Sequence, residues 1–469
     1  MSRALISEHS GMLQELQRYY QCQTVRERML EFLGEAVFIA ANDGCSEVWE
    51  STSPNHLLSY LQSGLEVDRS LWDRNSLIAH LDLEYHNFDN PAAPWLDPER
   101  AFQLQQPVLD ASRHILGNAG IMPLTLVSGR GFHLVWAVRR DSKAFRRLAG
   151  LGYVTLSLQA RYAEPCSPDD ASVDLDTGRA FAGLGLVLDF VWHRVLKETA
   201  PGATISVQPA AIEVGPEVHG REIVAFDLSE YGDPLHTRRI RLPFSAYLKP
   251  KQFEWLLGED EIRRLLPIFE VPLYGMSSEQ AIRVARDPEA VIELSRHGST
   301  AIPNASEPME ALLDHYQACE LRAFHDEFYR QLADQEPFPA GLGAMHVPDA
   351  PGCVQWLLEY PNDWLLKPAA LQHVVRVLMA LGWNPASIAH LIYATYLKDC
   401  DWHDTWMRLD PLNRALFYTR LFAGMIVTGS DKLIDFNCVS HQEKGQCPNP
   451  DCPSNLITYR DMLLKRRRH

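Results

Sequence analysis

Asp82 and Glu84 are separated by one residue near the end of an apolar segment, residues 77–85. In a β-strand successive side chains point to opposite faces, so these two carboxylates would point the same way. Neighbouring carboxylates repel each other unless a cation lies between them, and Mg²⁺ and Mn²⁺ prefer oxygen ligands. The pattern predicts a metal site, with a solvated strand edge as the alternative interpretation.

A Ser-Gly-Arg-Gly-Phe-His segment lies between two further apolar segments, residues 124–128 and 132–138. Its glycines permit positive φ and close backbone approach, so consecutive N–H groups could form an anion-binding nest. The serine, arginine and histidine side chains add donors that suit a triphosphate. A glycine-rich hairpin is the alternative. The residues concerned are Ser128, Gly129, Arg130, Gly131 and His133.

A third acid, Asp227, closes the apolar residues 223–226, and an arginine-rich segment follows it. Guanidinium groups bind phosphate oxygens in a bidentate manner, which lysine cannot do. The region therefore offers one more metal ligand and several phosphate contacts, although alone it would indicate only a charged hairpin. The candidate phosphate ligands are Arg238, Arg239, Arg241, Ser245 and Lys249.

Near the C-terminus, three cysteines and a histidine lie in the spacing Cys438-x2-His441-x5-Cys447-x4-Cys452. Tetrahedral zinc takes four nitrogen or sulfur ligands, and short loops with turn residues let such ligands converge. This pattern predicts a structural Zn²⁺ site. Chance clustering of the four residues is the alternative.

Composition indicates a protein of several cores. The chain has 469 residues, 46% of them hydrophobic and 22% charged. Single cores stop growing at about 250–300 residues, so we expect roughly two or three domains. The formal net charge of -16 opposes general attraction to nucleic acid, but a site for divalent metals must itself contribute carboxylates. The basic residues 465–469 form either a solvated tail or a nucleic-acid contact.

The nine cysteines are scattered, without the dense framework of a secreted disulfide protein. There is no signal-peptide pattern and no run of about 18 apolar residues. We therefore expect a cytoplasmic protein with reduced thiols and no membrane partner.

The periodicity predicts an α+β first half and a mainly helical second half. Helices are expected over residues 1–35, 107–119 and 179–197, and strands over 36–41, 77–85, 124–128, 132–138, 223–228 and 239–244. Further helices are expected over 279–296, 309–332, 371–381, 386–397 and 413–425, with linkers at 298–307 and 337–352. The predicted domains are 1–255, catalytic; 256–345, a helical linker region; 346–430, helical; and 431–469, the zinc-binding segment with the basic tail.

The order of the motifs carries a resemblance. Acid-x-acid, then Ser-Gly-x-Gly-x-His, then a lone acid leading into an Arg-x-Pro-x-Ser segment resembles the archaeo-eukaryotic primase superfamily, including its primase-polymerases, over residues 75–250. The resemblance implies an α+β module beside a recognition-motif-like antiparallel sheet. It also implies that Asp82, Glu84 and Asp227 hold two catalytic Mg²⁺ or Mn²⁺ ions. Nucleotide phosphates would contact Ser128, Gly129, Arg130, Gly131 and His133, and the pocket would be completed by Arg241, Ser245 and Lys249.

The chain departs from this pattern at two points. Glu84 stands where many members have a second Asp, as occurs in the primase-polymerase branch. The connection from Asp227 to the arginine cluster is longer than in many relatives, so the choice among Arg238, Arg239 and Arg241 stays open. The helical region around residues 352–428 loosely resembles domains attached to bacterial and plasmid primases, and an all-helical packing domain is its alternative interpretation.

The implied activity is template-dependent nucleotidyl transfer by a DNA primase or primase-polymerase. Its partners would be a single-stranded DNA template and nucleoside triphosphates. No Gly-x4-Gly-Lys-Ser/Thr phosphate loop occurs, so a helicase would be a separate protein, as would other replication or defence proteins. One alternative is a non-catalytic or weakly catalytic nucleotide- or nucleic-acid-binding factor in replication or defence. Another is a repair polymerase that only extends primers.

Overall fold

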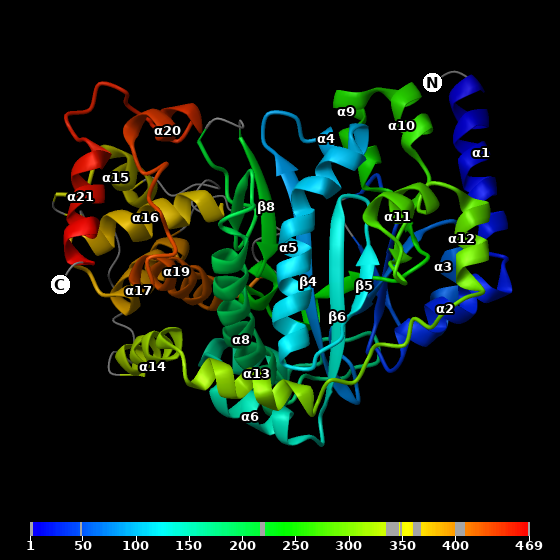
Figure 1. Ribbon diagram of the computed structural model, residues 1–469, viewed down its shortest axis with the longest axis horizontal. Helices are drawn as coiled ribbons and strands as arrows, with labels where there is room; N and C mark the ends of the chain where they lie inside the picture. The colour runs from blue at the N-terminus through cyan, green and yellow to red at the C-terminus, as the bar shows by residue number, and fades with distance from the viewer. Residues whose placement is uncertain are drawn as a thin grey trace.

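The computed structural model describes residues 3–46, 49–215, 221–333, 347, 349–359, 367–398 and 409–467. Over these residues the chain is an α+β protein whose strands form two larger, mainly antiparallel sheets and a two-stranded ribbon within residues 39–272, followed by helices (Figure 1). The expected α+β class and its helical second half are confirmed. No helix among the described residues combines the length and apolarity that crossing a bilayer requires.

The larger sheet has six strands, of which β4 (Ser76–Asn87) is central and longest. All described pairings in it are antiparallel except the parallel pair at its edge. The strand order is β12 (Val271–Pro272), β5 (Leu124–Val127), β6 (Gly131–Arg139), β4, β8 (Glu222–Asp227) and β7 (Ser206–Gln208). Helices α5 (Pro98–Asn118) and α8 (Leu175–Thr199) lie across one face of this sheet (Figure 1).

The side chains of strand β4 alternate between the two faces of the sheet. Its odd-numbered residues, Leu77 to Tyr85, are apolar or aromatic, buried, and share the face that meets the helices. Leu83 shows this arrangement, because it pairs with Phe132, whose ring meets that of Phe102 in α5 at 5.0 Å. The even-numbered residues therefore point to the opposite face, where the titratable groups of the strand collect.

The smaller sheet lies over that opposite face. Its order is β2 (Glu50–Thr52), β1 (Ile39–Asn42), β3 (Glu66–Ser70) and β9 (Arg239–Arg241), and a separate ribbon pairs β10 (Ala246–Tyr247) with β11 (Ile268–Phe269). Helices α1 (Arg3–Tyr19), α2 (Gln23–Leu33) and α3 (Leu57–Gln62) belong to this side of the molecule (Figure 1). The Tyr19 hydroxyl donates to the Phe244 carbonyl at 2.9 Å, which joins α1 to the segment before β10.

The remaining elements of the first half are short. They are α4 (Ala93–Leu96), α6 (Lys143–Leu151), α7 (Leu156–Ala163), α9 (Glu254–Leu257) and α10 (Glu259–Leu265), with 3-10 turns at Pro54–His56, Ser229–Gly232, Leu235–Thr237 and Lys249–Phe253. Helices α11 (Ser278–Val284), α12 (Pro288–Ser295), α13 (Pro308–Gln317) and α14 (Glu320–Ala333) follow. Helix α13 packs against α6 and α8, so the chain crosses the helical face of the sheet again before entering its last part.

The last part contains α15 (Gly352–Glu359), α16 (Pro368–Ala380), α17 (Pro385–Tyr396), α19 (Pro411–Val427), α20 (Cys438–Glu443) and α21 (Leu456–Arg466). Helix α19 packs against α16 and α17, and α21 packs against α16. These helices gather on the side of the large sheet where β8 and the edge strand β7 lie (Figure 1).

Three sequence-based expectations about helices are corrected. The helix expected over residues 309–332 is divided into α13, which ends at Gln317, and α14, which begins at Glu320. Helix α5 begins at Pro98, where the Asp97 side chain accepts the Arg100 N–H, and Pro107 lies inside the helix rather than at its start. The helix expected over residues 279–296 is divided before Pro288, because Asp287 caps a new helix there. Most of the expected linker at 337–352, and the tail residues Arg468 and His469, lie outside the described residues.

The predicted boundary at residue 255 falls inside a connected structure. Strands β11 and β12 lie in the region expected to be a helical linker, yet they pair with β10 and β5. Glu270, between these two strands, contacts the central sheet, as described below. The first structural unit therefore extends beyond residue 255.

Candidate active site

Three titratable residues lie in one row across the central strands of the large sheet. Asp82 of β4 pairs with His133 of β6 on one side and with Asp227 of β8 on the other. Directly opposite residues on neighbouring strands have Cβ atoms about 4.5–5.5 Å apart, so the three side chains share one small region. The sequence reasoning expected these groups to meet, and the strand register brings them together.

Burial and neighbouring carboxylates raise the pKa values of both aspartates. Burial, followed by the charge of Glu84, raises the pKa of Asp82 to about 7, and Asp227 contributes to the rise. Burial likewise raises the pKa of Asp227, and Glu84 adds to it. Carboxylates pressed together in this way gain most from a cation between them.

Glu84 is held ionised by cations. Arg130 donates to both of its oxygens, and His86 lies 3.3 Å from Oε2. Burial opposes ionisation of Glu84, but Arg130, His86 and Lys249 hold its pKa well below the ordinary value. The predicted phosphate ligand Arg130 is therefore paired with a predicted metal ligand.

His133 lies between two carboxylates. Its Nδ1 is 2.9 Å from Glu270 Oε1, and its Nε2 is 3.5 Å from Asp82 Oδ1. Burial lowers the pKa of His133, but Glu270 and Asp82 together raise it to about 9. The imidazole is consequently a cation at neutral pH, as a phosphate-binding group should be.

A pocket of about 410 Å³ opens between the two sheets at this row. Arg241 stacks over the Tyr247 ring at 4.7 Å and donates to Glu66, and Arg239 stacks over the Trp49 ring at 4.2 Å. Both guanidinium groups therefore reach the pocket from β9. The predicted site residues that line it are Asp82, Glu84, Ser128, His133, Arg241 and Lys249.

The other predicted residues lie elsewhere. Ser245 is fully buried and its hydroxyl accepts the Val67 N–H at 2.8 Å, so it supports β3 rather than the pocket. Asp227 lies in the row with Asp82 and His133 but does not line the pocket. Arg130, which pairs with Glu84, does not line the pocket either. Arg238 pairs with Asp233 at 2.8 Å, which leaves Arg239 and Arg241 as the arginines of the pocket.

The two glycines act by close packing. Neither Gly129 nor Gly131 has a positive φ, so the left-handed conformation expected for a nest is not found. A Cβ on Gly129 would lie 2.3 Å from the Tyr247 ring, and one on Gly131 would lie 1.8 Å from the Leu83 carbonyl oxygen. Glycine is needed at both positions because neighbouring atoms leave no room for a side chain.

Several polar atoms that face the pocket have no hydrogen-bond partner among the described residues. They are Asp82 Oδ1, Asp68 Oδ1, Arg241 Nε and the Tyr247 hydroxyl. Three of these atoms have only long ion-pair contacts, because Asp82 Oδ1 is 3.5 Å from His133 Nε2 and Asp68 Oδ1 is 4.0 Å from Arg241 Nε. Buried polar groups in native proteins are nearly always hydrogen-bonded, so this set of groups around one pocket suits a polar or ionic ligand.

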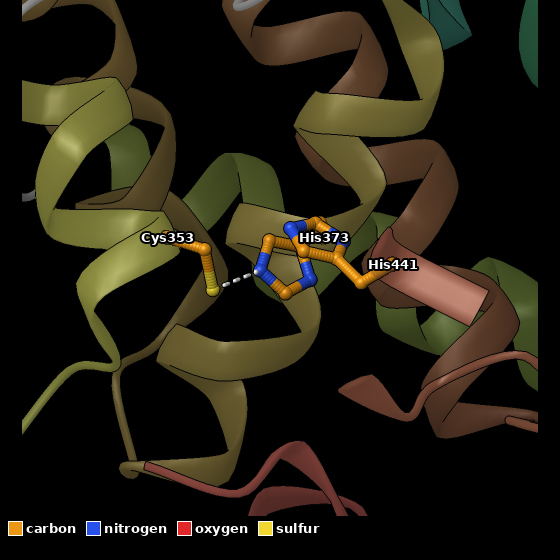
Figure 2. A group of neighbouring side chains, drawn as sticks. All are labelled: Cys353, His373 and His441. Carbon is orange, nitrogen blue, oxygen red and sulfur yellow. Dashed lines mark hydrogen bonds between the residues drawn. The ribbon is translucent and has the colours of Figure 1, made fainter. Parts of the chain in front are cut away.

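A second cluster of possible metal ligands lies among the C-terminal helices. Cys353 of α15, His373 of α16 and His441 of α20 are buried and place their ligand atoms within 4.8 Å of one another. The Cys353 Sγ is 3.2 Å from His373 Nε2, and Figure 2 shows this thiol directed at the His373 ring with the His441 ring beside it. His441 Nε2 has no hydrogen-bond partner among the described residues. The cluster could hold a metal ion.

This cluster differs from the predicted zinc ligands. Only His441 belongs to both sets, because Cys438, Cys447 and Cys452 lie outside the group within 4.8 Å. All three nevertheless line a pocket of about 570 Å³ together with Cys353 and His441. The local spacing of residues 438–452 therefore points to the same region as the possible metal cluster, and Cys353 and His373 reach that region through tertiary packing.

Sequence reasoning also missed residues of the first site. Glu66 and Asp68 bring two more acids into the pocket from β3, and Glu270 orients His133. Each lies in a short strand or connection with no motif around it. His80 stands beside Asp82 in the recognised segment and lines the pocket, so the period-2 alternation could have found it.

Compared with protein-family models, with curated proteins and with solved structures, the chain matched none. The geometry of the two sites is therefore what supports a functional proposal.

Proposed function

We propose that the pocket between the two sheets binds a nucleoside triphosphate with Mg²⁺ or Mn²⁺ and transfers its nucleotidyl group to a growing strand. The protein would be a primase-polymerase of the archaeo-eukaryotic primase type, acting on a single-stranded DNA template. The single observation that supports this most is the row of Asp227, Asp82 and His133 across three neighbouring strands.

In this proposal the acids hold the metals. Asp82 and Asp227 are the nearest pair, and Glu84 is two residues from Asp82 on the same face of β4. Two divalent ions here would activate the attacking hydroxyl and stabilise the pyrophosphate leaving group. Binding of a metal would also offset the burial and the neighbouring negative charge that raise the pKa values of both aspartates.

The cations of the pocket would bind the triphosphate. His133 is held charged by Glu270, and Lys249 and Arg241 line the same pocket. Positive groups fixed before the reaction stabilise charge that develops on the phosphates during transfer. Metal binding by Glu84 would compete with its ion pair to Arg130 and free that guanidinium for the substrate.

A second candidate function is binding without transfer. In the ion pairs Arg130–Glu84 and Arg241–Glu66, the arginines and glutamates already neutralise each other. A catalytic site would need those arginines for phosphates and those carboxylates for metal ions. This observation favours a replication or defence factor that binds nucleotides without incorporating them.

The possible metal ligands of the C-terminal cluster are one thiol and two imidazoles, whereas those of the pocket between the two sheets are mainly carboxylates. Such donors suit zinc, as predicted from the spacing of residues 438–452, or iron, and they do not suit Mg²⁺. A metal at that cluster would therefore be a structural part separate from the nucleotidyl-transfer site.

The test is incorporation of labelled nucleotides on a primer-free single-stranded DNA template with Mn²⁺ or Mg²⁺. We expect products from the wild type and a loss of at least about 100-fold for Asp82→Ala and Asp227→Ala, because each variant removes a metal ligand. Ribonucleotides and deoxyribonucleotides are supplied in separate reactions, and a primed template tests extension alone. Nucleotide binding without any product would favour the second candidate, and full activity of both variants would exclude the assigned metal ligands.

A further inference from the structure

Four cysteines from distant parts of the chain line one pocket. Cys353 stands near the start of α15, Cys438 begins α20, and Cys447 and Cys452 lie in the connection between α20 and α21. The pocket has a volume of about 570 Å³. Four thiols around one cavity indicate a metal centre to which all four would bind.

The spacing of the four sulfurs argues against a single ion shared by all of them. Zinc–sulfur bonds are about 2.3 Å long, so four thiolates on one zinc ion lie closer together than 4.8 Å. No three of these four cysteines form a group within 4.8 Å. Thiolates that bind different irons of one iron–sulfur cluster lie farther apart, and four cysteines are the usual ligand set for such clusters.

The surroundings of two of the sulfurs already supply hydrogen bonds that a bound thiolate requires. The Leu456 N–H donates to Cys438 Sγ at 3.3 Å, and His373 Nε2 lies 3.2 Å from Cys353 Sγ. Hydrogen bonds to the sulfurs stabilise the ionised ligands and tune an iron–sulfur centre. In this arrangement His373 would form a hydrogen bond with the metal ligand Cys353 and would not itself bind the metal.

We propose that Cys353, Cys438, Cys447 and Cys452 bind an iron–sulfur cluster that fastens the C-terminal segment to α15. This inference concerns the C-terminal metal alone and does not depend on nucleotidyl transfer. Between α20 and α21 the chain has turns but no helix or strand, so few backbone contacts hold that connection in place. The cluster would supply the cross-link, as metals do in other small segments without a core of their own.

The test is the metal content and spectrum of the full chain purified without oxygen and without chelator. We expect iron and acid-labile sulfide in equal amounts, about four of each per chain for a [4Fe–4S] centre or about two for a [2Fe–2S] centre. We also expect the broad visible absorption that thiolate-to-iron charge transfer produces. Zinc at about one per chain without iron or sulfide would overturn the proposal and support the zinc prediction instead.

Single variants test the ligand set. Cys353→Ser, Cys438→Ser, Cys447→Ser and Cys452→Ser should each lower bound iron severalfold or change the cluster spectrum, and Cys166→Ser and Cys319→Ser, which alter cysteines outside the pocket, should not. His373→Gln should keep the iron but shift the spectrum, because it alters a contact to Cys353. Full iron in Cys353→Ser would show that α15 supplies no ligand. The wild-type spectrum keeps the proposal testable even if a variant does not fold.

Discussion

At the scale of residues, the first site is a balance of opposed charges. Asp82 and Glu84 line a pocket with His133 and Lys249, and Asp227 lies next to Asp82 in the neighbouring strand. Burial raises the pKa of Asp82 to about 7 and lowers that of Lys249 to about 8, so both groups are poorly stabilised without a ligand. Groups strained in this way are typical of functional sites, where stability is given up for binding or catalysis.

The strain at Asp82 can be measured as stability. Its folded-state pKa of about 7 lies above the value of about 3.9 expected in the unfolded chain, so metal-free stability should fall as pH rises from 4 to 7 and stay low above that. We expect Asp82→Asn to raise the melting temperature in EDTA at pH 8 by about 3 °C or more, with no gain near pH 4.

The control for this measurement is Asp260→Asn, whose side chain is 87% exposed and which should leave the pH profile unchanged. A wild type as stable as Asp82→Asn at pH 8 would contradict the account of Asp82. Thermal unfolding followed by circular dichroism gives both comparisons.

Much of this residue chemistry could be predicted from sequence. Strand alternation identifies Asp82 and Glu84, the glycine-containing segment 128–133 identifies His133, and the end of an apolar segment identifies Asp227. Glu270 could not be found, because its role comes from contact with a residue of a distant strand. Ser245 was misplaced because a motif position does not show whether a hydroxyl faces a pocket or a neighbouring strand.

At the scale of elements, the register between β4 and β6 decides whether the site forms. A slip of one residue would move Asp82 and its neighbours to the helical face of the sheet. Gly131 helps to fix this register, because only glycine lets β6 approach Leu83 of β4 so closely.

Gly131→Ala should therefore destabilise the protein. The added Cβ would lie 1.8 Å from the Leu83 carbonyl, and the resulting strain should cost about 3 kcal/mol of unfolding free energy. Gly150→Ala in α6 is a matched control, since nothing lies within 4 Å of its added Cβ and alanine favours helix by up to about 1 kcal/mol. Urea unfolding compares them, and equal stability of the two variants would contradict the packing role of Gly131.

Elements with strong periodicity can be predicted from the sequence, but the residues at which they begin and end are harder to predict. Strand β4 and the β5–β6 hairpin follow from apolar runs broken by glycine. The helix predicted over residues 107–119 is too short, because a proline such as Pro107 often begins a helix. Helix α5 in fact begins at Pro98, where the side chain of Asp97 caps it. Strands β11 and β12 have two residues each, too few for a periodic pattern to register.

At the scale of the whole molecule, buried ion pairs join the C-terminal segment to the helices. Arg376 of α16 donates to Asp431 at 2.8 Å and to Asp435 at 3.1 Å, and Lys444 also contacts Asp435. Arg376 and Lys444 hold the pKa of Asp435 below its ordinary value against the effect of burial. Residues 431–444 are thereby fixed against α16, next to the pocket of the four cysteines.

Arg376→Met should weaken this docking strongly. Removing Arg376 leaves Asp431 buried without its ion-pair partner and leaves Asp435 with Lys444 alone, and breaking a buried pair in this way typically costs about 3–5 kcal/mol. Arg283→Met removes an exposed pair with Glu279 on α11 and should change stability by less than about 0.5 kcal/mol. Denaturant unfolding measures both values, and similar small losses in the two variants would show that Arg376 does not dock the segment.

The central claim is that Asp82 and Asp227 share a divalent metal beside the phosphate-binding pocket. The most direct measurement is anomalous diffraction from crystals soaked with Mn²⁺ and a non-hydrolysable nucleoside triphosphate. We predict a manganese peak between these two carboxylates, with the triphosphate extending toward His133 and Lys249. Manganese bound elsewhere in well-ordered crystals, or a nucleotide outside this pocket, would contradict the account.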